Sequence, residues 1–107
     1  GAKKLGGATN MSADGKTNQL LVNGSIINGS ITLNGGNNNI GNESTALTNT
    51  TINSGAATGN NLITAKSLLG GSISMGDSND TVTVSGTITG TAINLGGGTN
   101  LLNGVTV

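Results

Sequence analysis

A repeat of about twenty residues runs through the sequence and limits what the chain can fold into. Going backwards from Ile73, an apolar residue lies twenty-one positions earlier at Ile52 and twenty-one earlier again at Ile31. Met11 lies twenty positions before that, and Ile93 lies twenty positions after Ile73. A fixed period of this length is typical of repeat proteins, in which each unit packs on its neighbours. Five units are therefore visible.

Each unit contains short stretches in which apolar and polar residues alternate. In the unit that begins at residue 72, the alternation over residues 72–75 is followed by Gly76 and Asn79, and then by Val82 and Val84. Alternation indicates strands with one buried face, and clusters of Gly and Asn indicate turns. The units therefore consist of short strands joined by tight turns.

A unit of twenty residues is too small to bury its own apolar face, whereas stacked units enclose a continuous core. We therefore expect an all-β fold, a right-handed parallel β-solenoid (β-helix) of about five coils of 20–21 residues. Residues 1–107 are expected to form a single β-solenoid segment, a fragment of a longer repeat array, because residues 101–107 keep the strand pattern and show no polar cap. The open edge there is expected to permit end-to-end association with another molecule.

Inward-facing apolar residues are expected to stack in columns, one residue from each coil. The first predicted column is Met11, Ile31, Ile52, Ile73 and Ile93. The second is Leu20, Ile40, Leu62 and Val82. A third set of equivalent positions is Ile26, Ala46, Leu68 and Ile88.

Asparagines also recur at one place in the repeat. Asn18, Asn38 and Asn100 each follow an apolar anchor by seven residues, and either Asn60 or Asn61, and either Asn79 or Asp80, lies close to the same place. Stacked amides can hydrogen bond from coil to coil, and Asn tolerates the left-handed backbone of a tight corner. Both interpretations are structural, and neither implies a ligand.

The composition argues against several functions. The chain has no aromatic residue, Cys, Pro or His, its charged residues make up 7% and its net charge is zero. With neither a basic patch nor aromatic side chains, nucleic-acid binding is not expected. No apolar run is long enough for a membrane span.

The stretch from Gly76 to Val82, GDSNDTV, comes close to the calcium-binding nonapeptide of β-roll proteins. Calcium needs six to eight oxygen ligands, gathered in such proteins from successive turns. The matching stretches at residues 35–41 and 97–103 contain no acid. We therefore interpret this stretch as a Gly/Asn corner and expect no metal site.

Two Thr-x-Thr motifs, at residues 81–83 and 87–89, are similar to the threonine ranks of ice-binding solenoids. Such a surface repeats the motif on every coil, and here we expect it on one coil only, so ordinary strand propensity explains it. Acid–base catalysis needs titrating groups within hydrogen-bonding reach of each other. Asp77 and Asp80 lie on an expected loop without a cationic partner. We expect no enzyme activity, no catalytic residue and no cofactor.

Two stretches, SISMGDSNDTVTVSGTITG at 72–90 and INLGGGTNLLNGV at 93–105, carry a resemblance to a known family. Short coils of this kind resemble the passenger domains of type V autotransporters, the surface and secreted adhesins or toxins of Gram-negative bacteria. The resemblance extends in pattern over residues 11–107. It implies a right-handed β-helix stalk exported to the bacterial cell surface or secreted, with a role in cell adhesion and virulence.

The expected function is that of a non-catalytic structural stalk or spacer segment of such an adhesin. Its partners would be the neighbouring coils of a longer chain and, through other domains, a host-cell receptor or glycan. One alternative is a binding module whose exposed Asn and Thr face recognises a glycan or a protein. Another is an amyloid-like self-assembling solenoid, because Asn-rich repeats with open strand edges can stack between molecules.

Overall fold

The computed structural model describes residues 2–11, 17–33, 35–54 and 58–104, and all regular secondary structure in these ranges is β-strand. The strands are β1 (Ala2–Met11), β2 (Thr17–Leu20), β3 (Val22–Leu33), β4 (Gly36–Ile40), β5 (Ala46–Thr48), β6 (Thr51–Ser54), β7 (Thr58–Ala65), β8 (Ser67–Leu69), β9 (Ser72–Ser74), β10 (Asp80–Val84), β11 (Ile88–Thr89), β12 (Ala92–Asn94) and β13 (Leu101–Asn103). Most are three to five residues long, which suits a chain that turns a corner after each one.

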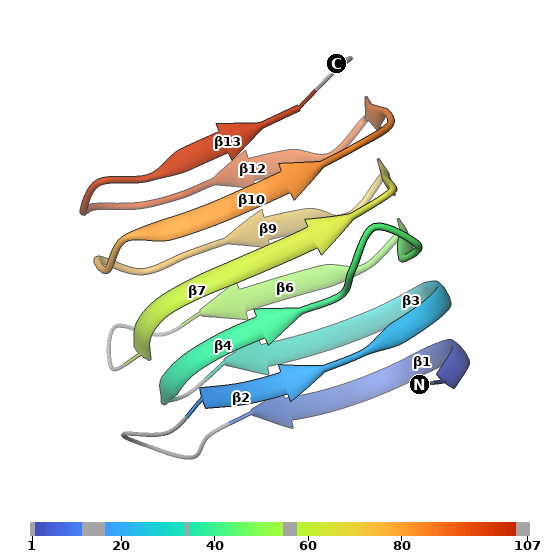
Figure 1. Ribbon diagram of the computed structural model, residues 1–107, viewed down its shortest axis with the longest axis horizontal. Coiled ribbons are helices and arrows are strands. Elements are labelled where there is room, and N and C mark those ends of the chain that lie inside the picture. The colour runs from blue at the N-terminus through green and yellow to red at the C-terminus, as the bar shows by residue number, and fades with distance from the viewer. Residues whose placement is uncertain (1, 12–16, 34, 55–57, 105–107) are drawn as a thin grey trace.

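The strands stack into a solenoid in which every described pair is parallel. One face is a five-stranded sheet in the order β13-β10-β7-β4-β2. The other faces belong to an eight-stranded sheet in the order β11-β8-β5-β3-β6-β9-β12, with β1 also paired to β3. Figure 1 shows the chain running one way along the front sheet, returning behind it and climbing as a right-handed coil. The expected right-handed parallel β-solenoid is confirmed.

The solenoid has about four turns, slightly fewer than the five coils expected from the sequence. The front sheet contains five strands, and five stacked strands are separated by only four steps. The repeat units were therefore counted correctly, but the chain climbs one step fewer than the number of units.

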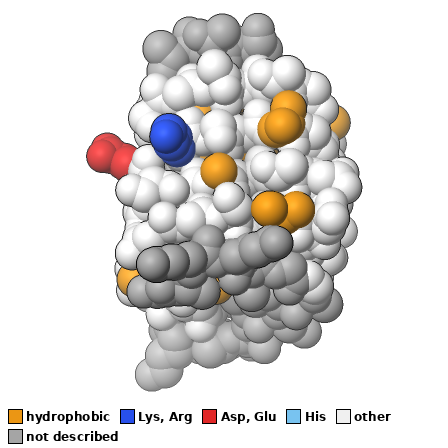
Figure 2. Space-filling view, turned by 90° about the vertical axis from the view of Figure 1, so that its right-hand side faces the viewer, with side chains coloured by type: hydrophobic (Ala, Val, Ile, Leu, Met, Phe, Trp, Pro, Cys, Tyr) orange, Lys and Arg blue, Asp and Glu red, His pale blue; other side chains and the backbone are white. Residues whose placement is uncertain are grey.

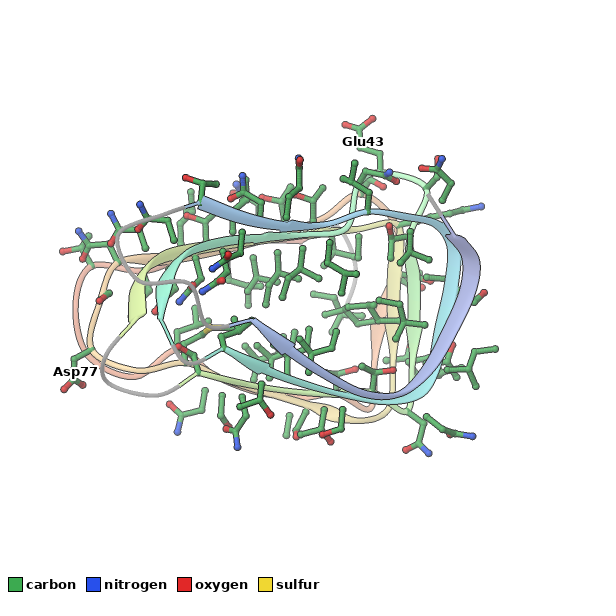
Figure 3. All side chains as sticks on the ribbon, turned by 90° about the horizontal axis from the view of Figure 1, so that it is seen from below. Glu43 and Asp77 are labelled. Carbon is green, nitrogen blue, oxygen red and sulfur yellow. The ribbon has the colours of Figure 1, made fainter. Side chains whose placement is uncertain are left out.

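The first apolar column is confirmed for four of its five members. Ile31 lies opposite Ile52, Ile52 opposite Ile73, and Ile73 opposite Ile93. The first three of these side chains are buried, and Ile93 in the last coil is partly buried. Figure 3, seen along the solenoid axis, shows apolar side chains filling the interior between the sheets.

Met11 is not a member of this column. It pairs with Leu33, and Thr9 takes the place opposite Ile31. The prediction assumed a constant step of twenty residues, whereas the pairing of β1 with β3 contains two register irregularities, between Ala2 and Lys4 and between Leu5 and Gly7. Such bulges shift a strand relative to its neighbour without changing the fold.

The second column contains Ile63 in place of the expected Leu62. Ile63 lies opposite both Ile40 and Val82 and is fully buried, whereas Leu62 faces outward and is 39% exposed. The column is Leu20, Ile40, Ile63, Val82 and Leu102. Twenty-three residues separate Ile40 from Ile63, so the longer third unit shifts the strand by one position relative to the prediction.

A similar correction applies to Ala46 in the third set. Leu47 lies opposite Ile26 and Leu68 and is buried, whereas Ala46 is only half-buried. The column is Ile26, Leu47, Leu68 and Ile88. Successive side chains of a strand point to opposite faces, so an error of one residue exchanges the inside for the outside.

One corner of the coil, which lies within β3 in the first coil and between β5 and β6 in the next, is built from residues with left-handed backbone. Asn28 and Asn49 have φ values of 55° and 48°, and the next two coils place Gly70 and Gly90 there. The Asn49 amide nitrogen donates to Oδ1 of Asn28 at 2.7 Å, so the amides also join the coils. At Gly71, a Cβ atom would lie 2.3 Å from the carbonyl oxygen of Thr50, so no side chain fits where these coils meet.

Candidate functional site

The feature with the most distinctive chemistry is a ladder of amides inside the front sheet. Asn18, Asn38, Asn61 and Asp80 occupy matching positions on β2, β4, β7 and β10. The amide nitrogen of Asn18 donates to Oδ1 of Asn38 at 3.0 Å, and that of Asn38 donates to Oδ1 of Asn61 at 2.8 Å. The amide nitrogen of Asn61 donates to Oδ1 of Asp80 at 2.9 Å. The predicted coil-to-coil ladder is confirmed for these four residues, whereas the amide nitrogen of Asn100 bonds within its own turn.

The ladder lies inside the protein because it shares a strand face with an apolar column. Asn38 and Ile40 are both buried on β4, Asn61 and Ile63 on β7, and Asp80 on β10 two residues before Val82. Residues two apart on a strand point the same way. Buried amides need hydrogen-bond partners, and these obtain them from the neighbouring coils and from turn carbonyls such as that of Gly35. The ladder therefore fixes the register of the coils.

Asp80 differs from the sequence-based expectation. It was expected on a loop without a cationic partner, but it is the first residue of β10, is 1% exposed and is bonded to both neighbouring coils. Its Oδ1 accepts from the side chain and the backbone of Asn61, and its backbone N–H donates to Oδ1 of Asn100 at 2.9 Å. Its Oδ2 is the buried side-chain atom without a hydrogen-bond partner among the described residues.

Burial raises the pKa of Asp80 above its ordinary value of 3.8, and the hydrogen bonds from Asn61 act in the opposite direction. Burial is the larger cause because a charged carboxylate loses its hydration inside the coil. Asp80 is thus a buried acid held against amides, without a cation in the neighbouring strands β7 and β13.

A second row of asparagines, not distinguished from the first by sequence, lies on the outside of the same corner. Oδ1 of Asn37 accepts from the backbone N–H of Asn60 at 2.8 Å, and Oδ1 of Asn60 from that of Asn79 at 3.1 Å. Oδ1 of Asn79 accepts from the backbone N–H of Thr99 at 2.6 Å. The sequence contains adjacent polar pairs at residues 37–38, 60–61 and 79–80. Because neighbouring residues in a strand face opposite sides, these pairs could have predicted one inner and one outer row.

The two acids of the calcium-like stretch GDSNDTV point in different directions. Asp77 is exposed at an outer corner, where Figure 3 shows it pointing away from the coil, while Asp80 is buried inside. Glu43 is exposed at another corner of the ring. Across the residues that the structure describes, no group of three or more His, Cys, Asp or Glu side chains could hold a metal ion.

Calcium is therefore expected to leave the thermal stability of the chain unchanged. One outward carboxylate and one buried carboxylate do not supply the six to eight oxygens that calcium requires. Melting curves recorded by circular dichroism across a calcium titration should overlay. A saturable rise of several degrees at sub-millimolar calcium would show that GDSNDTV is a metal site after all.

The Thr-x-Thr motifs lie on outer faces. Thr81 and Thr83 point outward from β10, with Thr81 between Leu62 and Leu101 and Thr83 between Thr64 and Asn103. The threonines thus do not form a rank repeated on every coil.

The outer surface is polar with isolated apolar side chains. The exposed large apolar residues among those described are Leu21, Leu62, Leu69, Leu101 and Leu102. Figure 2, which faces the right-hand side of the solenoid in Figure 1, shows the hydrophobic atoms as separate groups on a mostly polar surface. Leu102 belongs to the inward column, and its 44% exposure arises because β13 is the last strand of the front sheet.

Comparisons of the chain with protein-family models, with curated proteins and with solved structures gave no significant match. The part of the chain that the structure describes contains no helix long and apolar enough to cross a membrane. The similarity to autotransporter passenger domains stays a prediction from the sequence.

Proposed function

We propose that the chain is a non-catalytic spacer segment in the stalk of a bacterial surface-displayed or secreted adhesin. The observation that supports this function best is the stacking of equivalent residues in register, such as Ile31, Ile52 and Ile73. Each added coil extends such a rod by the spacing of neighbouring strands, about 4.8 Å. The number of repeats then sets how far a tip domain is held from the cell.

The contacts between coils suit a stiff spacer. Parallel backbone pairing joins neighbouring coils along the front sheet and along both arms of the sheet that contains β3. The buried amides at Asn38 and Asn61 add side-chain hydrogen bonds between the same coils. Sliding one coil by a single residue would expose the apolar columns and break this ladder, so the coils resist displacement.

The family and location belong to the same proposal. A β-helix of short Gly-, Asn- and Thr-rich coils suits the passenger domain of a type V autotransporter, displayed on the bacterial cell surface or secreted. Its immediate partners would be further coils of its own chain, and the host receptor or glycan would be bound by other domains. When the segment is isolated from such further coils, the strand edges at β11, β12 and β13 would be open to end-to-end association, which is part of this proposal.

A second candidate function is a binding module, which the front sheet favours. Its outer face presents the exposed side chains of Leu62 and Leu101 on either side of Thr81. Apolar and hydroxyl groups on a flat, rigid sheet could contact a protein or a glycan. The stalk is preferred because interfaces are usually anchored by Trp, Tyr or Arg, and the chain has no Trp or Tyr.

Deleting one coil tests the spacer function. Removing residues 53–73 joins Ile52 to Ser74, which keeps the register because Ile52 and Ile73 are equivalent. We expect this variant to fold and to be shorter by about 4.8 Å in solution scattering. The matched control removes residues 53–63 only, which joins the back face to the front sheet in mid-coil, and it should not fold.

A binding assay separates the two candidate functions. Beads coated with the chain alone should adhere to host cells no better than bare beads if the chain is a spacer. Saturable adhesion that is lost when Leu62 and Leu101 are replaced with serine would instead establish the binding module.

A further inference from the structure

The amide ladder has a direction that is interrupted at one position. Asn18 donates to Asn38, Asn38 to Asn61 and Asn61 to Asp80, in each case from one coil to the next along the chain. An aspartate carboxylate carries no hydrogen, so the donation cannot continue from Asp80 to the following coil. The ladder therefore ends in a carboxylate although the coils continue.

The position beyond Asp80 is occupied by another acceptor. Oδ1 of Asn100 lies 2.9 Å from the backbone nitrogen of Asp80 and accepts its hydrogen bond. The amide nitrogen of Asn100 bonds within the turn that precedes it, donating to the carbonyl oxygens of Leu95 at 3.0 Å and Gly97 at 2.9 Å. Oδ1 of Asn100 thus accepts from the backbone of Asp80 as Oδ1 of Asp80 accepts from the backbone of Asn61. Oδ2 of Asp80 is buried without a hydrogen-bond partner among the described residues.

Among the residues that the structure describes, no nearby charge compensates the Asp80 carboxylate. The strands paired with β10, which are β7 and β13, carry no titratable side chain, and neither do β6, β9 and β12 in the other sheet. Asp77 on the preceding turn is exposed and has the same sign of charge. Lys66 follows the far end of β7, five residues beyond Asn61, which is roughly 16 Å along an extended strand.

We propose that Asp80 is a proton-operated link between the coils, in which a proton on Oδ2 completes the amide ladder toward Asn100. A protonated carboxyl group has nearly the shape of the asparagine amide, with an O–H in place of the amide N–H. Asp80 would then donate to the next coil as Asn18, Asn38 and Asn61 do. Acidification is accordingly expected to strengthen the solenoid, whereas acid usually destabilises proteins through their paired carboxylates.

The direction of the pKa supports this proposal. Burial raises the pKa of folded Asp80 above its ordinary value of 3.8. When the pKa of a group is higher in the folded state than in the unfolded state, its protonation stabilises the fold. This stabilisation is complete at a pH below the unfolded-state pKa and is lost as the pH rises through the folded-state pKa. The pH window therefore opens near 3.8 and extends upward to the folded pKa.

The test compares thermal melting of the wild-type chain, Asp80→Asn and Asp77→Asn between pH 3 and pH 8. Lowering the pH should raise the wild-type melting temperature by roughly 4–8 °C, the shift that one added hydrogen bond produces in a domain of this size. Asp80→Asn supplies the missing donor permanently, so it should melt above the wild type at pH 8 and lose most of the pH dependence. Asp77→Asn removes the same charge at a place outside the ladder, so this variant should keep the pH dependence of the wild type.

A direct titration of Asp80 keeps the proposal falsifiable if a variant fails to fold. The ¹³C chemical shift of the Asp80 carboxyl carbon, followed by NMR in the wild-type chain, should change at a pH above 3.8. A midpoint below 3.8 would overturn the proposal. A wild-type chain that melts at lower temperature in acid, or an Asp80→Asn variant less stable than the wild type at pH 8, would overturn it as well.

Discussion

Replacing Ile52 with aspartate is expected to prevent the chain from folding into its solenoid. Ile52 is 0% exposed and lies between Ile31 and Ile73 in the central apolar column. An unpaired charge at this place has no hydration and no partner, so the free energy of unfolding should fall by roughly 4 kcal/mol or more. A loss of that size is a large part of the total stability of a typical domain, which is about 5–15 kcal/mol.

The matched control is Asn53→Asp, which places the same charge one residue further along β6. Asn53 is exposed on the outer face, so water can hydrate the new carboxylate and the change in stability should stay within about 0.5 kcal/mol. Far-UV circular dichroism with urea denaturation checks both variants. If Ile52→Asp and Asn53→Asp unfold at the same urea concentration, the inward column has been assigned to the wrong residues.

Replacing Asn38 with alanine is expected to give the second-largest loss of stability. Asn38 is 0% exposed, accepts from Asn18 at 3.0 Å and donates to Asn61 at 2.8 Å. It also donates to the carbonyl oxygen of Gly35 at 3.3 Å. Removing the amide deprives buried groups in three coils of a partner. At about 1–3 kcal/mol for a buried polar group left unsatisfied, the expected total is about 3 kcal/mol.

Asn37→Ala is the control for this prediction because it removes the same amide from the outer row. Asn37 is exposed, and water can replace its hydrogen bond to the backbone N–H of Asn60. The loss should therefore be below about 1 kcal/mol. Urea denaturation of both variants measures the difference, and equal losses at positions 37 and 38 would contradict the assignment of the inner ladder.

Much of the fold could be predicted because its signals are local. The alternation around Ile31, Ile52 and Ile73 identifies the buried face of each strand, and the constant period identifies the stacking. The ladder at Asn18 and Asn38 followed from the same spacing. The prediction failed at Leu62 and Ala46, where the true inward residues, Ile63 and Leu47, lie next to another apolar residue.

The sequence by itself determined that the chain is a repeating all-β protein, that apolar residues line its interior and that asparagines stack between its coils. These properties depend on residue type and spacing alone. Only the tertiary structure decided which member of each neighbouring pair faces inward. Asn61 is buried rather than Asn60, and Asp80 is buried rather than Asn79. The reason is that a strand's register is set by hydrogen bonds to the neighbouring coil, and one inserted residue reverses the faces. The burial of the Asp80 carboxylate is a consequence of that register.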